Sequence, residues 1–158
     1  MGGPAKVQII NQFVAAGANV LSKELGATVT RSGLELEANP YTSEEITVVV
    51  GVSGAFAGSI YLSMTERTAL SIVSTMLGQE MPIFDDLAQS GIAELANVVA
   101  GTAGVSLSEM GHRIDITPPL LVVGSGARLS SMELQRLVVP LDTPSGIVRL
   151  HVALREAA

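Results

Sequence analysis

The stretch EITVVVGVSGAFAGSIYLSM, residues 45–64, carries the clearest fold signal in this chain. Its β-branched residues flank a short Ser-Gly-Ala segment at residues 53–55, a pattern typical of two strands joined by a turn. We therefore predict a β-hairpin here. Alternation predicts another strand over residues 28–37, and the segment around Pro118 and Pro119 is expected to form two extended pieces.

Helices are expected before and after the hairpin. Helical periodicity runs over about residues 7–25, and a capping box at residues 63–66 is expected to open a short second helix. A longer third helix, capped by Asp85 or Asp86, should run to about Gly111. These elements predict an α+β fold, with two long helices on one face of a largely antiparallel, six-stranded sheet.

The chain has 158 residues, which suits a single domain over residues 1–158. Two further strands near the end are joined by DTPSG, residues 142–146, and the last of them alternates between an apolar and a mixed face. The chain then divides into two pseudo-repeated halves, about residues 7–64 and 85–155, each a helix followed by about three strands.

Composition excludes several classes of function. A net charge of −6 without clustered Lys and Arg argues against nucleic-acid binding. The chain has no cysteine, and its two histidines, His112 and His151, form no metal-binding pattern, so we expect no metal of its own. It shows neither a signal sequence nor an apolar run long enough to span a bilayer. We therefore expect a cytoplasmic protein with no membrane partner.

The third helix has an unusually bare polar face around AELANVVAG, residues 93–101. Ser90, Glu94, Asn97 and Gly101 fall within roughly 60° of one another at 100° per residue. The opposite side is apolar and should pack on the sheet. Glycine in a helix interior costs about 1 kcal/mol relative to alanine, so the glycines of this helix should admit a close neighbour, either an internal helix or another protein.

The segment SGIAELANVVAGTAGVSLSEMGHRIDITPP, residues 90–119, resembles the signature of the CheC/CheX/FliY family of chemotaxis phosphatases. That signature is a Ser or Asp, then ExxN, then a proline some twenty residues later. Members of the CheC branch carry the ExxN pair in both halves. Here Asn19 corresponds to Asn97, but Ala16 replaces Glu94, which makes the chain similar to the CheX branch in particular.

The resemblance implies a CheC-like fold and a phosphatase that acts on the aspartyl phosphate of a CheY-like response-regulator receiver domain. Asn97 would orient the attacking water, and Glu94 would pair with a receiver lysine and fix the docking. Ser90 and Gly101 would contact the receiver. Mg²⁺ would belong to the receiver, so this chain would need no cofactor of its own. The resemblance also implies a homodimer.

Other interpretations stay open at the sequence level. A CheX-like module could bind a receiver or another signalling protein without hydrolysing anything. A small-molecule sensor would need a deep apolar pocket, of which a chain with 3% aromatic residues gives no sign. Ser90 could be an ordinary surface hydroxyl. We expect His112 and Asn19 to be structural rather than catalytic.

Overall fold

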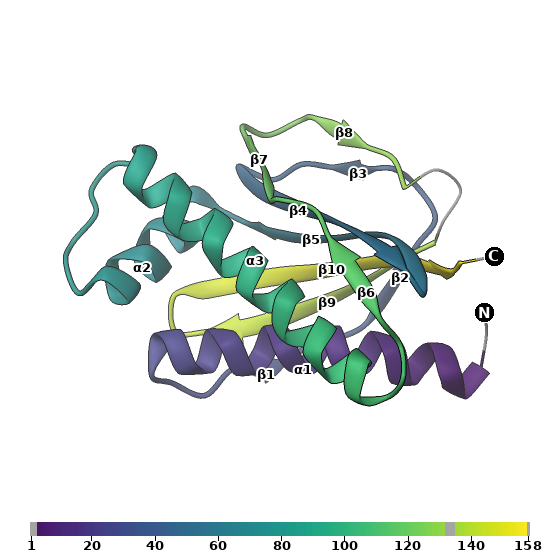
Figure 1. The fold of residues 1–158 in the computed structure, drawn as a ribbon. Coiled ribbons are helices and arrows are strands. Elements are labelled where there is room, and N and C mark those ends of the chain that lie inside the picture. The colour runs from purple at the N-terminus through teal and green to yellow at the C-terminus, as the bar shows by residue number, and fades with distance from the viewer. Residues whose placement is uncertain (1–2, 132–134, 158) are drawn as a thin grey trace.

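The computed structural model describes residues 3–131 and 135–157, and in this part of the chain two long helices lie on one face of an antiparallel sheet, with a shorter helix at one end (Figure 1). The helices are α1 (Gly3–Leu25), α2 (Glu66–Leu77) and α3 (Asp86–Glu109). The strands are β1 (Thr30–Arg31), β2 (Glu35–Glu37), β3 (Tyr41–Thr42), β4 (Ile46–Gly54), β5 (Phe56–Met64), β6 (Ile114–Ile116), β7 (Leu120–Val123), β8 (Arg128–Leu129), β9 (Arg136–Thr143) and β10 (Gly146–Glu156).

The main sheet has the strand order β1-β9-β10-β5-β4-β6, with β2 also paired to β9 and β7 also paired to β4. Every pairing is antiparallel, as predicted. The expected hairpin is β4 and β5, at the centre of the sheet. In the described residues the sheet has eight strands rather than six, because two short strands share each outer partner.

The expected strand over residues 28–37 is broken into β1 and β2 by an extra residue. Arg31 lies opposite Leu141, whereas Glu35 lies opposite Val138, so four steps on one strand face three on the other. Such a mismatch is a β-bulge. Pro140 contributes to it, because its carbonyl accepts the Ser32 N–H (3.1 Å) but it has no N–H to donate in return.

The cap of α2 differs from the prediction. Thr65 rather than Ser63 caps this helix, and its hydroxyl oxygen accepts the Thr68 N–H at 3.2 Å. Ser63 is the penultimate residue of β5 and is fully buried. The capping box was wrong by two residues, because the strand continues through Met64 before the chain turns into the helix. Gly78 ends α2 with a φ of 65°.

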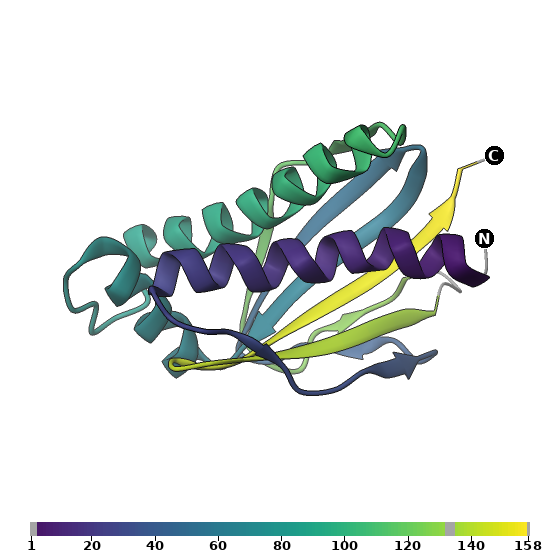
Figure 2. The same ribbon diagram turned by 90° about the horizontal axis from the view of Figure 1, so that it is seen from below.

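The cap of α3 is one of the two predicted residues. The side chain of Asp85 accepts the Ala88 N–H at 3.0 Å. The helix ends at Glu109, two residues before the expected Gly111, whose φ of 86° is unfavourable for other residues. Seen from below, α1 and α3 lie side by side along the sheet (Figure 2).

The core lies between these helices and the sheet. It takes alternate residues of the central strands, among them Val48, Leu62, Val139 and Leu150, all fully buried. From α3 it takes the apolar side that the sequence predicted. The other face of the sheet is partly covered by the separate two-stranded sheet of β3 and β8. None of the helices in the described ranges has both the length and the hydropathy needed to cross a membrane.

Candidate functional site

The exposed face of α3 is where the sequence predicted it. Ser90 and Glu94 are exposed, and Asn97 and Gly101 are half-buried. The opposite face is sealed: none of its apolar residues is more than 1% exposed, and they are Ile92, Leu95, Ala96, Val99 and Ala103. The structure therefore brings the four predicted site residues together on one strip of helix, with the sheet behind it.

The carboxylate and the amide on this strip take no part in the polar interactions of the fold. Within residues 3–131 and 135–157, neither the carboxylate of Glu94 nor the amide of Asn97 makes a hydrogen bond or an ion pair. Surface side chains without partners in the chain contribute little to stability. Both groups are thus available to another molecule.

The glycines of α3 have different explanations. A Cβ added at Gly91 would lie 3.3 Å from Val73 of α2, and one at Gly104 would lie 3.6 Å from Ile114 of β6. Packing within the chain therefore accounts for these two positions. At Gly101 an added Cβ would meet nothing within 4 Å. Gly101 therefore lowers the stability of the helix, and no packing within the described part of the chain requires a glycine at this position.

A surface hollow of about 400 Å³ lies beside Gly101. Its lining comes from the second half of α3, from β6 and from the residue before β6: Ala100, Gly101, Gly104, Val105, Ser108, Arg113, Ile114 and Ile116. A second hollow, of about 250 Å³, lies on the α1 side of α3 and includes Asn19, Lys23, Val98 and Thr102. The polar strip of α3 is thus flanked by a hollow on each side.

The surroundings of α1 explain why this helix has no counterpart of the Glu94–Asn97 pair. Asn19 is exposed, as is expected of a counterpart of Asn97. Ala16, however, is only 3% exposed and belongs to the core. A glutamate at position 16 would place a charge in an apolar interior, which is costly. The burial of Ala16 leaves α1 with an isolated asparagine.

His112 and the Pro118–Pro119 pair have structural surroundings. The backbone N–H of His112 donates to the Leu107 carbonyl at 2.8 Å and closes the end of α3. Its ring packs edge-on against Phe56, with 5.3 Å between ring centroids. The proline pair separates β6 from β7, as predicted. None of these residues lies on the polar strip of α3.

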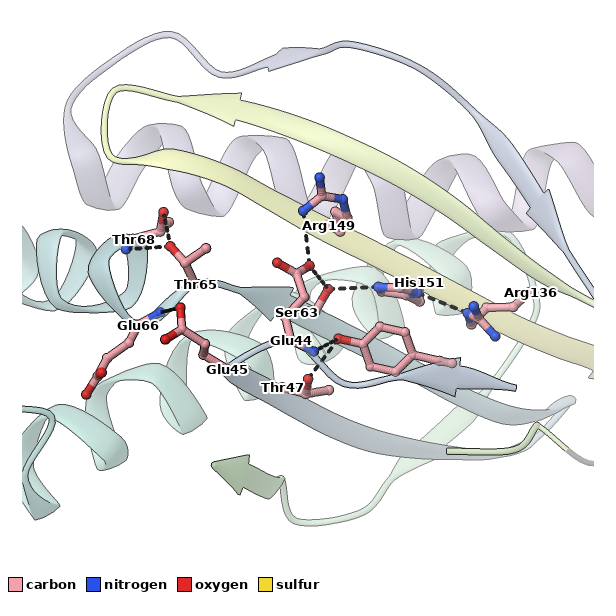
Figure 3. A network of polar contacts seen from close by, with 11 residues as sticks. Glu44, Glu45, Thr47, Ser63, Thr65, Glu66, Thr68, Arg136, Arg149 and His151 are labelled. Atoms are coloured by element: carbon pink, nitrogen blue, oxygen red, sulfur yellow. Dashed lines mark hydrogen bonds and ion pairs between the residues drawn. The ribbon is translucent and has the colours of Figure 1, made fainter. Parts of the chain in front are cut away.

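A second polar cluster, which the sequence did not predict, lies on the sheet face away from the helices (Figure 3). Arg136 Nε donates to His151 Nδ1 at 3.0 Å, and His151 Nε2 lies 2.9 Å from the Ser63 hydroxyl. That hydroxyl donates to Glu44 Oε1 (3.1 Å), which also pairs with Arg149 at 3.0 Å. The signal that could have revealed it is the alternation of Arg149 and His151 on the mixed face of the last strand.

Tyr41 of β3 covers this cluster. Its ring lies 4.6 Å from the His151 ring and 5.4 Å below the Arg136 guanidinium, measured to the tyrosine centroid. Its hydroxyl lies 3.0 Å from the hydroxyl of Thr47 and accepts the Glu44 N–H at 2.8 Å. No buried side-chain nitrogen or oxygen of the described residues is left without a partner. The buried polar atoms of the cluster are therefore all paired.

The Ser63–His151 pair in this network is unsuited to nucleophilic catalysis. Because Arg136 donates to Nδ1, the neutral imidazole carries its proton on Nε2 and cannot accept the Ser63 proton there. Burial, and then the charges of Arg136 and Arg149, lower the pKa of His151 to about 3, too low for a general base at neutral pH. Ser63 is also fully buried. We therefore assign the candidate site to α3.

The described residues contain no group of three or more His, Cys, Asp or Glu side chains placed to hold a metal ion. The chemistry available on the α3 strip is consequently that of an amide, a carboxylate and a hydroxyl. An amide can orient a water by donating and accepting hydrogen bonds, and a carboxylate can pair with a cation.

This arrangement, two long helices laid on one face of an antiparallel sheet, is that of CheC-like proteins. A CheC-like superfamily protein from Shewanella sp. PV-4 has the same fold, with a TM-score of 0.85 over 94% of this chain and 98% of that chain at 23% identity. The family model described as chemotaxis phosphatase CheX matches residues 46–142. The chain belongs to the CheX family.

Two relatives are informative about this family. The CheY-P phosphatase CheX of Thermotoga maritima is 30% identical over 125 residues, which cover 78% of this chain and 81% of the relative. The CheX of a CheX–CheY–BeF3–Mg²⁺ complex from Borrelia burgdorferi is 28% identical, with a TM-score of 0.77, and the match covers 93% of this chain and 97% of that chain. That CheX was thus captured with a CheY partner.

Proposed function

We propose that this chain is a phosphatase that hydrolyses the aspartyl phosphate of a CheY-like receiver domain. Membership of the CheX family supports the activity. One observation on the chain itself supports the site: Glu94 and Asn97 share an exposed strip of α3 and make no hydrogen bond or ion pair with any described residue. Polar side chains whose hydrogen-bonding groups are unused in the described part of the chain are suited to act on a partner.

In this proposal the Asn97 amide enters the receiver's active site and orients a water in line with the phosphorus. The water oxygen attacks phosphorus, and the bond from phosphorus to the aspartyl oxygen breaks. The products are inorganic phosphate, which takes up the water's protons, and the free aspartate. Phosphoryl transfer requires mainly positioning and charge stabilisation, so an amide suffices where a strong base is absent.

Glu94 lies one helical turn before Asn97 and is exposed. Its carboxylate is proposed to pair with a lysine of the receiver, which would set the depth and angle at which Asn97 enters. Ser90, one turn earlier, and Gly101, one turn later, would complete the contact. The missing side chain at Gly101 allows the receiver to approach the helix backbone, because nothing in this chain fills that space.

Mg²⁺ is proposed to be held by the receiver, where it would neutralise the phosphoryl oxygens. The Borrelia burgdorferi complex supports this, because it combines CheX and CheY with BeF3 and Mg²⁺. No step of the proposed mechanism requires a cofactor bound to this chain.

The test is phosphate release from a phosphorylated CheY-like receiver, measured for the wild type, Asn97→Ala and Glu94→Ala. Asn97→Ala should lower the stimulated rate about 100-fold while affinity for the receiver is retained, because only water positioning is lost. Glu94→Ala should weaken both affinity and rate. Asn19→Ala, the counterpart on α1, is the matched control and should behave as wild type.

A wild-type chain that binds the receiver yet leaves its intrinsic dephosphorylation rate unchanged would show a non-catalytic binding module instead. A full rate from Asn97→Ala would contradict the assigned mechanism while leaving the family activity intact. These two outcomes are distinguished by measuring binding and phosphate release on the same samples.

We also propose that the chain forms a homodimer and works in the cytoplasm. Exposed apolar side chains gather near the β2 edge of the sheet, where Val7, Leu34 and Leu36 are each more than half exposed. Edge strands of this kind are commonly covered by a partner. Light scattering across a concentration series should give twice the monomer mass, and Leu36→Glu should lower it.

A further inference from the structure

The hollow beside Gly101 has a chemistry of its own. Val105, Ile114 and Ile116 give it apolar walls, and Arg113 is the charged residue among those that line it. Its volume of about 400 Å³ gives room for a protruding side chain. Because Gly101 also belongs to the polar strip of α3, the hollow continues the surface on which the receiver is proposed to dock.

Arg113 is fixed in its backbone but free in its side chain. Its carbonyl accepts the Ala55 N–H at 2.9 Å, which ties it to the turn between β4 and β5. Its side chain is exposed and makes no hydrogen bond or ion pair with any residue in the described ranges. The backbone of Arg113 is thus fixed near the end of α3, and its guanidinium is available to another molecule.

The charges of this chain and of the receiver favour a cation such as Arg113 in the contact between them. The chain carries a net charge of −6, and a receiver's phosphorylated site combines an anionic aspartyl phosphate with the carboxylates that hold Mg²⁺. Two anionic surfaces repel one another at long range, so a free cation beside the docking strip offsets that repulsion locally.

We infer that Arg113 binds an acidic side chain of the receiver at the rim of the Gly101 hollow and so determines the direction in which the receiver lies on α3. This inference rests on the proposed function. Gly104 lines the hollow together with Arg113, and it lies about 15 Å beyond Glu94 along the helix axis. An anionic contact and a cationic contact therefore lie on either side of Asn97, and a receiver docked in the reverse direction brings like charges together.

The test uses a CheY-like receiver made persistently active with beryllofluoride and Mg²⁺, chosen from the host's receivers by capture on the wild-type chain. Affinity is measured at low and high salt for wild type, Arg113→Glu and Arg113→Lys. Arg113→Glu should weaken binding about 10-fold at low salt, with the difference shrinking at high salt. Arg113→Lys should restore most of the affinity because it keeps the charge.

The control is Arg155→Glu, the same charge change at an exposed residue of β10 that lies on the sheet face away from the helices. It should bind as wild type. At subsaturating receiver, phosphate release should fall together with affinity in Arg113→Glu and should stay at the wild-type level in Arg155→Glu, because Arg113 acts by docking the receiver.

Several outcomes overturn the inference. The first is wild-type receiver affinity in Arg113→Glu, and the second is an equal loss of affinity in Arg155→Glu. The third is a change in oligomeric mass instead of receiver affinity, which would assign the hollow to a contact between two copies of the chain. A wild-type chain that binds the receiver without accelerating phosphate release overturns the proposed catalysis, and Arg113 is still tested by affinity.

Discussion

The two polar clusters of this protein lie on opposite sides of the main sheet, and they differ in whether their polar groups are paired within the chain. On the face away from the helices, the Arg136–His151–Ser63 network is buried, and none of its buried polar atoms is left without a partner. On α3, Glu94 and Asn97 have no partner among the described residues. Burial forces polar groups to satisfy one another, whereas exposure lets them stay available.

The comparison gives a rule for interpreting mutations. Changes in the buried network should lower the free energy of unfolding and should affect activity only through folding. Changes on the α3 strip should affect activity with little effect on stability. The four predictions that follow test this division, in order of decreasing effect on the free energy of unfolding.

Arg136→Met should have the largest effect. Arg136 donates to His151 Nδ1 and to the Asn39 carbonyl (2.9 Å), so its replacement leaves both acceptors without a donor. We expect a loss of about 3 kcal/mol. Urea unfolding measures it, with Arg155→Met as the exposed control on the same sheet face. A loss below about 1 kcal/mol would show that the network contributes little to stability.

Lowering the pH from 7.5 to 5 should destabilise the fold by about 2 kcal/mol through His151 alone. Its pKa is about 3 in the folded protein, against 6.5 when the chain is unfolded. The unfolded chain therefore binds the extra proton between these values, so stability is full above pH 6.5 and falls as the pH drops toward 3.

Denaturant unfolding at the two pH values measures this effect in wild type, His151→Gln and His112→Gln. Only His151→Gln should lose the pH dependence. Should that variant fail to fold, NMR titration of the His151 ring replaces it: a ring that protonates near pH 6 would contradict the prediction.

Gly101→Ala should stabilise the protein by about 1 kcal/mol while weakening receiver binding. The added Cβ meets nothing within 4 Å, so the helix gains propensity without a clash. Gly91→Ala is the matched control, and its gain should be smaller because its Cβ would lie 3.3 Å from Val73. If Gly101→Ala were stabilised and still bound the receiver with wild-type affinity, close approach of a partner would not explain this glycine.

Asn97→Ala should have the smallest effect on stability, within about 0.5 kcal/mol of wild type, despite its expected loss of activity. The amide makes no hydrogen bond or ion pair with any described residue, so its removal leaves no polar group unsatisfied. Thermal unfolding, compared with Ser90→Ala on the same strip, checks this. A marked loss of stability in Asn97→Ala alone would place Asn97 with the structural residues.

Local patterns predicted much of the fold. The β4–β5 hairpin, α1, α3 and the apolar side of α3 follow from periodicity and capping, which act within a few residues. The short strands β3 and β8, and the bulge that divides the strand predicted over residues 28–37, did not, because partners far along the chain determine them. The internal duplication stays a prediction.

The candidate site was predicted in its residues but not in its setting. Helical spacing alone places Ser90, Glu94, Asn97 and Gly101 on one face. Which α3 glycine is free could not be predicted, because Val73 and Ile114 reach Gly91 and Gly104 only through tertiary packing. The buried network was missed for the same reason: Ser63 and His151 are 88 positions apart in the sequence.

The helix that presents Asn97 is held at both ends. Asp85 caps its start, and at its end His112 donates to the Leu107 carbonyl while its ring packs on Phe56. A surface preorganised in this way loses little conformational entropy when it is bound, which favours tight association. In an encounter between the two proteins, loop adjustment is therefore expected mainly on the receiver's side.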